Sequence, residues 1–236
     1  MQKIDCESCK HRLCASQVPI FSFLSREELL KIVSMTGHIA FKKGELITGE
    51  GDVSNTLFII NEGQVKLSKV TRDGKEQIVH ILTSGDFFGE LNIFGGREKN
   101  NFSAWAISPV KICTLNKESM DKILLANPEI ALKLIKEISK RLADTENLAQ
   151  NLATKDAELR IAYILLELTE RYSHKTVRGV EIALPITREE MASYAGLTRE
   201  TISRKLALMQ DQGIIEFEGN KNVIIKDEAY LRDMLL

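Results

Sequence analysis

Long apolar runs and an excess of charge of one sign are both missing from this sequence. It holds no stretch of eighteen or more consecutive apolar residues, which argues against a membrane-spanning helix. Its first twenty residues are polar and carry cysteines where a secretory signal would have an apolar segment, so we expect a cytoplasmic protein. The formal net charge is -1. Bulk charge therefore indicates neither an acidic nor a basic partner.

Cysteine is scarce, and its distribution is uneven. Cys6, Cys9 and Cys14 lie within nine residues, and Cys113 follows about a hundred residues later. Thiols stay reduced in the cytoplasm, so this arrangement indicates metal binding or redox chemistry before a structural disulfide. The residues leave four interpretations open. They are a [4Fe–4S] cluster on four thiolates, zinc on four thiolates or on three with His11, a thiol–disulfide switch, and a buried apolar Cys113 beside a tail that binds nothing.

Histidine is scarce as well, with four residues in the chain. Only His38 and His80 fall in the region of short strands, and they match no His-x-His pattern of a cupin enzyme. No paired nucleophile and base is recognisable either. We therefore expect that the protein is not an enzyme.

Residues 41–115 read as short β-type runs separated by glycine and aspartate, for example "TLFIINEGQVKLSKV" and "SAWAISPVKICTL". Many short strands with turn residues at this spacing predict a barrel or jelly roll. A short helix precedes this region, with Ser25 as its N-cap and Glu28 completing a capping box.

The periodicity changes at Asn127. Pro128 suits a first helical turn, and the following residues predict a helix to Leu152, roughly 37 Å long at 1.5 Å per residue. Its stripe of apolar and small residues either packs against the chain's own roll or pairs with a second copy, which we favour because the rest of the helix is strongly charged. The stripe consists of Ala131, Ile135, Ile138, Leu142, Thr145, Ala149 and Leu152.

Two compact helices near the C-terminus predict a helix-turn-helix. Thr187 begins the first as part of a capping box with Glu190, and Gly196 ends it. Thr198 caps the second helix, which ends at Gly213 and is followed by a short hairpin, "GIIEFEGNKNVIIKD".

The second helix is predicted to turn Ile202, Leu206 and Met209 inward, leaving its other face for DNA. Arg204 suits a bidentate pair with guanine, and Glu200 suits a cytosine amino group. From residue 158 onward there are 11 Lys and Arg against 13 Asp and Glu, so net charge does not favour DNA binding. The predicted dimer helix does, because it supplies the dimer that two DNA half-sites require. The candidate DNA-binding residues are Thr198, Arg199, Glu200, Thr201, Ser203, Arg204 and Lys205.

The whole layout resembles the Crp/Fnr superfamily of bacterial transcription regulators. "GDFFGELNIF" with "SAWA" is similar to the ligand-binding segment of that family, and "LTRETISRKLALMQDQGII" is similar to its recognition helix. The resemblance implies an α+β fold with a cyclic-nucleotide-binding-type β jelly roll, a long dimerisation helix and a C-terminal winged helix-turn-helix. The boundaries expected are 1–17 for the cysteine segment, 18–126 for the roll, 127–153 for the dimer helix and 154–236 for the DNA-binding domain.

Two branches of the family compete. The cyclic-AMP receptor branch follows its Gly-Glu-Leu loop with an Arg-Ser pair that neutralises the cyclic phosphate. Here Gly89, Glu90 and Leu91 are present, but the pair reads Phe102–Ser103, and a buried phosphate without a guanidinium is poorly compensated. Glu90 is then a structural acceptor, and a cyclic-nucleotide-responsive regulator is the lesser alternative.

The Fnr branch fits better. Glu200, Ser203 and Arg204 match its recognition helix, which implies binding to an inverted repeat of TTGAT-type half-sites. The four cysteines match the ligands of its oxygen-labile [4Fe–4S] cluster, although the gap of four residues before Cys14 is one shorter than in the best-known member. Some relatives instead look like thiol–disulfide switches that pair an N-terminal cysteine with the roll cysteine. The resemblance also implies a homodimer that contacts RNA polymerase through the hairpin around Asp73–Gly74.

Overall fold

The computed structural model describes residues 2–3, 16, 18–96, 98–219 and 221–235. The chain divides into two compact units, one formed by residues 1–69 and 79–143 and the other by 70–78 and 144–236. Among the helices of the described ranges, none is long and apolar enough to span a membrane.

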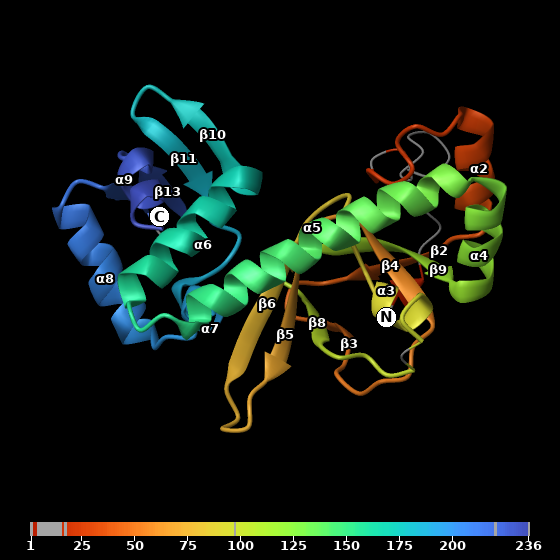
Figure 1. The fold of residues 1–236 in the computed structure, drawn as a ribbon, viewed down its shortest axis with the longest axis horizontal. Coiled ribbons are helices and arrows are strands. Elements are labelled where there is room, and N and C mark those ends of the chain that lie inside the picture. Colours follow the sequence, from red (N-terminus) through yellow and green to blue (C-terminus); the bar gives the residue numbers. More distant parts are fainter. Residues whose placement is uncertain (1, 4–15, 17, 97, 220, 236) are drawn as a thin grey trace. The chain divides into compact units, whose positions relative to one another are not determined.

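The first unit is built on two antiparallel sheets that form the jelly roll (Figure 1). One sheet has the strand order β1 (Gln2–Lys3), β2 (Gly37–Phe41), β9 (Val110–Asn116), β4 (Thr56–Glu62) and β7 (Phe87–Phe88). The other has the order β3 (Leu46–Thr48), β8 (Ser103–Ala106), β5 (Val65–Val70) and β6 (Glu76–Leu82). The predicted roll is confirmed.

Strand β9 has two buried faces because successive side chains of a strand point to opposite sides of its sheet. Val110 and Ile112 belong to the core between the sheets. Cys113 and Leu115 belong to a second core. It also contains residues of the N-terminal turn (residues 18–24) and of the helices α2 (Arg26–Ser34) and α4 (Lys117–Ala126). The outward-facing side of β9 is therefore as dry as the inward-facing side.

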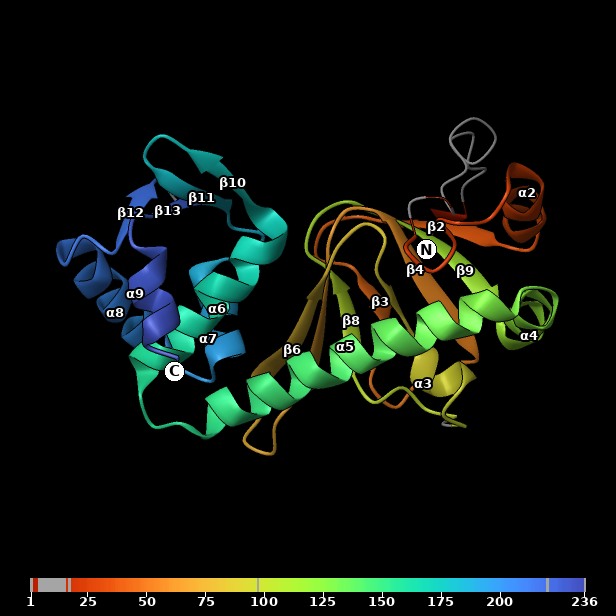
Figure 2. The ribbon, with the colours of Figure 1, turned by 45° about the horizontal axis from the view of Figure 1, so that its top comes forward.

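Capping residues fix the ends of these helices. The predicted capping box of Ser25 and Glu28 is present at α2. Asn116 caps α4 by accepting from the backbone N–H of Ser119 at 2.8 Å. The short α3 (Glu90–Ile93) follows the left-handed Gly89, and α5 (Pro128–Ala153) is the predicted long helix. The first half of α5 lies beside α3 (Figure 2).

The second unit holds the predicted helix-turn-helix, formed by α7 (Arg188–Ala195) and α8 (Arg199–Asp211). They pack with α6 (Ala157–Tyr172) and α9 (Glu228–Asp233). A four-stranded antiparallel sheet completes the unit, with the order β10 (Ser173–Thr176), β11 (Gly179–Ala183), β13 (Asn222–Ile225) and β12 (Ile215–Glu218). The predicted terminal hairpin, β12 and β13, is thus half of a larger sheet.

The turn between α7 and α8 is tied to the chain segment that follows α5. Gly196 adopts the left-handed conformation expected of it, with φ of 62°. Arg160 of α6 donates to the carbonyl oxygen of Thr154, just after α5, and also to those of Ala195 and Gly196, at 3.1 and 3.2 Å. A single guanidinium therefore joins the end of the long helix to the helix-turn-helix.

Candidate functional site

The recognition helix α8 is fixed by its cap and by one buried stripe. The Thr198 side chain accepts from the backbone N–H of Thr201 at 3.2 Å. Ile202, Leu206 and Met209 are fully buried, which confirms the predicted orientation of the helix. The opposite face is left to solvent.

The seven predicted DNA-binding residues share this outward side, but not equally. Thr198, Arg199, Glu200 and Arg204 are exposed, whereas Thr201, Ser203 and Lys205 are half-buried. Within the described part of the chain, Arg204 and Glu200 take part in no ion pair. An open groove runs beside Arg204 along α8, lined by Arg204, Lys205, Ala207, Leu208 and Asp211.

Two cations of the helix are engaged with other side chains. Lys205 Nζ lies 3.0 Å from Glu158 Oε2 of α6, and only 27% of the lysine side chain is exposed. Arg199 pairs with Glu189 of α7 at 3.8 Å, with 70% and 72% of the two side chains exposed. The first pair braces α8 against α6, while the second is weak and easily exchanged for a phosphate.

Sequence reasoning did not single out a cation at the start of α7. Arg188 is exposed, and its guanidinium lies 4.7 Å from the centre of the Phe217 ring of β12. Arg188 is the first residue of a capped helix, which the sequence could show. Its contact with Phe217 could not be predicted, because it depends on where β12 lies in the sheet.

A buried acid joins α6 to α7. The Tyr194 hydroxyl lies 2.6 and 2.7 Å from the two carboxylate oxygens of Glu167. Burial raises the pKa of Glu167 to about 7, an effect opposed by the Tyr194 hydrogen bond and by Arg171. Burial also raises the pKa of Tyr194 well above its ordinary range.

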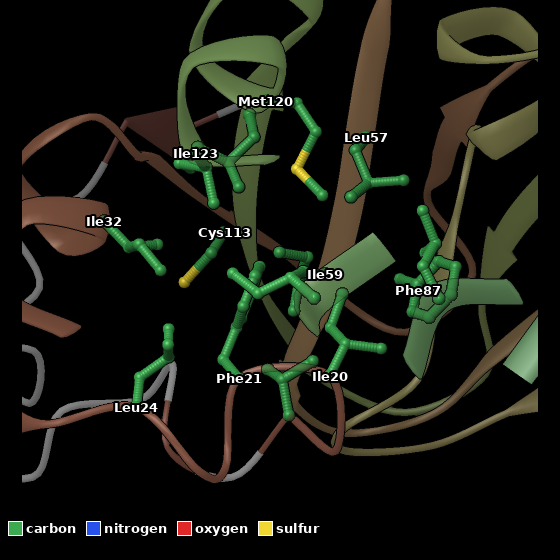
Figure 3. Close-up of a cluster of buried hydrophobic side chains, with 14 of the residues drawn as sticks. Ile20, Phe21, Leu24, Ile32, Leu57, Ile59, Phe87, Cys113, Met120 and Ile123 are labelled. Atoms are coloured by element: carbon green, nitrogen blue, oxygen red, sulfur yellow. The ribbon is translucent and has the colours of Figure 1, made fainter. Parts of the chain in front are cut away.

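Cys113 is the predicted sensor cysteine that the structure describes. It is 5% exposed and lies among apolar side chains of the N-terminal turn, α2, β4 and α4 (Figure 3). Its neighbour across the strands β2 and β9 is His38, whose Nδ1 lies 3.4 Å from the Cys113 sulfur. The sulfur borders a cavity of about 10 Å³, lined by Val18, Phe21, Ile32, Val33, Thr36, Ile59, Asn61 and Cys113.

Cys6, Cys9 and Cys14 lie outside the described residues, as does His11. Among the residues that the structure describes, no group of three or more His, Cys, Asp or Glu side chains is placed to hold a metal ion. A four-ligand site at Cys113 therefore needs these N-terminal residues. Val18 lines the same cavity as Cys113, and the four Cα–Cα steps from Cys14 to Val18 span at most about 14 Å.

The long helix α5 contacts the Gly-Glu-Leu turn of the roll, residues 89–91, through Arg141. Arg141 of α5 donates to Glu90 Oε1 at 3.0 Å and to the carbonyl oxygen of Phe87 at 2.7 Å. Its guanidinium also lies 5.1 Å from the centre of the Phe87 ring. Glu90 thus accepts a hydrogen bond from the long helix of its own chain.

Phe102 stands where the cyclic-AMP receptor branch carries its phosphate-binding arginine, and it lies beside other aromatic rings. Phe102 meets the edge of Phe88 with ring centres 6.3 Å apart, and Phe88 stacks on Phe58 at 4.8 Å. The Ser103 hydroxyl accepts from the backbone N–H of Glu50 at 3.0 Å. Arg97, the nearby cation in the sequence, lies outside the described residues.

The predicted dimer stripe of α5 is partly open. Ile135 is 60% exposed and Leu142 is 59% exposed, and Ala149 is exposed too. The other four members, Ala131, Ile138, Thr145 and Leu152, are half-buried. Leu132, beside the stripe, is 69% exposed.

Known proteins match both parts of the chain. The cyclic nucleotide-binding domain family matches residues 38–127, and the Crp-like helix-turn-helix domain family matches residues 159–234. The chain is 35% identical over 179 residues to the cAMP-activated global transcriptional regulator CRP of Pasteurella multocida, covering 74% of this chain and 83% of that protein.

Similar agreement extends to other regulators. The transcriptional activator protein FnrA of Stutzerimonas stutzeri is 30% identical over 190 residues, covering 80% of this chain and 77% of that protein. The solved structure of FixK2 from Bradyrhizobium japonicum superimposes with a TM-score of 0.74 at 27% identity, covering 84% of this chain and 96% of that one. These matches include both Crp-named and Fnr-named proteins. The chain belongs to the Crp/Fnr family of DNA-binding transcription regulators.

Proposed function

We propose that this regulator responds to oxygen or redox state through Cys6, Cys9, Cys14 and Cys113, which would together hold a [4Fe–4S] cluster. The observation that carries the proposal is the position of the Cys113 sulfur. It borders a cavity that Val18 also lines, and Val18 follows the cysteine segment closely enough for Cys14 to reach it.

The donor set suits the group. Four thiolates are the usual ligands of such a cluster, and an apolar shell around a metal site controls solvent access and redox potential. The cluster would supply sensitivity to oxygen. The chain's own part is to keep the Cys113 sulfur dry on β9 and to anchor the cysteine segment through Val18 and Phe21, both buried beside it.

Two other uses of the same sulfurs remain as alternatives. A disulfide between Cys113 and an N-terminal cysteine needs the same reach and no metal, and zinc would accept the same thiolates. A cyclic nucleotide is less suited to the roll. Its anionic phosphate would face Phe102 and the stacked rings of Phe88 and Phe58, which offer no charge-assisted hydrogen bond.

As output, we propose that a homodimer reads an inverted repeat of TTGAT-type half-sites and contacts RNA polymerase. The exposed Ile135 and Leu142 of α5 supply an apolar seam for the second copy. The exposed Arg204 and Glu200 supply the base-reading side chains. Two half-sites about 34 Å apart then match the two-fold symmetry of the dimer.

The cluster is tested by purifying the protein without oxygen and measuring iron, sulfide and visible absorbance. Equal iron and sulfide contents, lost in air and lost in Cys113→Ala, are expected. Protein that stays free of iron after anaerobic reconstitution would rule the cluster out. Thiol counts before and after an oxidant, with zinc analysis, then separate the two alternatives.

DNA reading is tested with Arg204→Ala. We expect it to lose about tenfold or more of the preference for a TTGAT-type site over a mutated site, because one good base pair contact is worth about 1–3 kcal/mol. Arg232→Ala on α9 is the control, since Arg232 is not among the predicted DNA-binding residues. Its guanidinium pairs with Glu228, so the preference should survive there. Equal preference in wild type and Arg204→Ala would mean that Arg204 does not read the base.

A further inference from the structure

The structure points to His38 as a positioning residue for the Cys113 sulfur. We propose that its imidazole holds this sulfur by a hydrogen bond and so sets how firmly Cys113 keeps its bound partner. The inference rests on the proposed sensor role of Cys113. It adds to that role a residue outside the cysteine set.

The backbone fixes the encounter between the two side chains. His38 and Cys113 are directly opposed partners in the antiparallel pair of β2 and β9, and opposed side chains emerge on the same face of a sheet. His38 Nδ1 lies 3.4 Å from Cys113 Sγ, within hydrogen-bonding distance for sulfur. Because both residues sit inside the ladder, this approach does not depend on a mobile loop.

The far side of the imidazole ring is held as well. His38 Nε2 lies 3.4 Å from Thr36 Oγ1, and the Thr36 hydroxyl donates to the carbonyl oxygen of Val33 at 2.8 Å. Val33 belongs to the last turns of α2. The ring is therefore positioned between the end of α2 and the sulfur, as second-shell partners position the ligands of metal sites.

This arrangement serves both forms of the sulfur. A thiol donates its proton to an imidazole nitrogen, whereas a thiolate needs a donor. The neutral ring can supply that donor at Nδ1 when Nε2 accepts from Thr36, whose hydroxyl hydrogen rotates to suit its partner. Apart from Cys113 itself, the described residues that line the cavity include two polar ones, Thr36 and Asn61. The His38 contact is thus a polar contact to a sulfur whose described surroundings are mostly apolar.

The consequence for a bound cluster follows from the chemistry of its ligands. Hydrogen bonds to the ligating sulfurs contribute to the reduction potential of an iron–sulfur cluster. Removing an outer-shell partner typically costs 10–100-fold in metal affinity or activity. Loss of the His38 bond should therefore shorten the life of the cluster in air.

Two substitutions separate the two sides of the ring. His38→Asn keeps an amide near the place of Nδ1, facing Cys113, whereas His38→Gln extends its amide toward the place of Nε2 and Thr36. We expect His38→Gln to lose its visible absorbance in air about tenfold faster than wild type, with a shifted midpoint potential. His38→Asn should stay close to wild type, as should His80→Gln, a control at another histidine of the roll. Thermal unfolding confirms that each variant is folded. Equal rates in all four proteins, or a faster loss in His38→Asn, would overturn the proposal.

A second measurement does not need the cluster, so it distinguishes failure of this inference from failure of the proposed cofactor. In metal-free protein with Cys6, Cys9 and Cys14 replaced by Ser, the Cys113 sulfur attacks glutathione disulfide. One glutathione joins Cys113, and the other leaves as a thiol that takes up the proton. Mass spectrometry gives the glutathione ratio at which half of Cys113 is modified. We expect His38→Gln to shift that ratio by about three- to tenfold, the worth of one hydrogen bond, and His38→Asn to leave it unchanged. An unshifted ratio in folded His38→Gln would refute the role of His38 even if wild type binds iron.

Discussion

Tyr194 of α7 donates its hydroxyl between the two carboxylate oxygens of Glu167 of α6, at 2.6 and 2.7 Å. Tyr194 is 1% exposed, and Ser193 beside it donates to the carbonyl oxygen of Glu76 at 2.6 Å. The first helix of the helix-turn-helix is thus fixed by half-buried polar contacts within its own unit, which includes residues 70–78 and so Glu76. An ionisable group in such a place makes the stability of that unit depend on pH.

Glu167 should make the DNA-binding unit less stable as pH rises toward neutrality. Its pKa is about 7 in the folded chain, against 4.5 for the solvent-exposed carboxyl of the unfolded chain. A raised pKa stabilises the fold below pH 4.5, and that contribution is lost between pH 4.5 and 7, by about 3 kcal/mol. Urea unfolding of wild type and Glu167→Gln across this window measures the difference.

We expect Glu167→Gln to match wild type near pH 4.5 and to exceed it in stability above pH 7. Gln keeps an oxygen that accepts from Tyr194 but carries no charge. The exposed Asp233→Asn, at the end of α9 in the same unit, is the control and should follow wild type. Parallel pH profiles for wild type and Glu167→Gln would show that Glu167 is ionised in the fold at low cost.

Arg141→Met should destabilise the roll by about 3 kcal/mol, because it leaves the buried Glu90 carboxylate without its partner. Glu90 Oε2 is buried and makes no hydrogen bond to the described residues, so Arg141 carries the compensation. Adding Glu90→Gln should recover part of the loss. Lys111→Met, which breaks an exposed ion pair of the same roll at 2.8 Å, should cost less than about 1 kcal/mol. Similar costs for Arg141→Met and Lys111→Met in urea unfolding would contradict this account.

Gly89→Ala should cost more than about 2 kcal/mol of unfolding free energy. Gly89 has φ of 92°, and a Cβ there would lie 2.3 Å from the carbonyl oxygen of Thr56. Gly74 has φ of 79° with nothing within 4 Å of its added Cβ, so Gly74→Ala should cost only about 1 kcal/mol. Thermal unfolding compares the two, and a smaller cost at Gly89 would show that the turn can move away from Thr56.

Leu142→Glu and Ile135→Glu should shift the protein from dimer toward monomer and weaken DNA binding with it. Each places a charge in the seam that the proposed dimer would bury. Leu125 of α4 is 84% exposed and lies outside the predicted stripe, so Leu125→Glu should leave assembly unchanged. Sedimentation velocity measures the populations. Variants that sediment as wild type does would exclude this face of α5 from the interface.

Local signals made much of the fold predictable. Both capping boxes, at Ser25 and Thr187, were read correctly because a cap involves residues only three positions apart. The buried stripe of α8 followed from its period, and the left-handed Gly196 from its place after an apolar helix. The sequence also showed that Phe102 stands in place of the arginine that binds the cyclic phosphate in the cyclic-AMP receptor branch, because this comparison involves a single position.

Contacts between distant segments could not be foreseen in the same way. Helix α4 was missed because it lies between a strand and the stronger period of α5. The pairs Glu167 with Tyr194 and His38 with Cys113 join residues 27 and 75 positions apart. Neither pair has a sequence signal, because only the packing of α6 on α7 and the register of β2 on β9 brings them together.

The three carbonyl oxygens bound by Arg160 imply how a signal is passed on within the DNA-binding unit. Thr154, Ala195 and Gly196 share one planar guanidinium, so one side chain holds the residue that follows the long helix against the turn between α7 and α8. A rotation at the C-terminal end of α5 would therefore be passed to α7 and α8 through Arg160. In the proposed dimer, such a rotation would change the distance along the DNA between the two recognition helices.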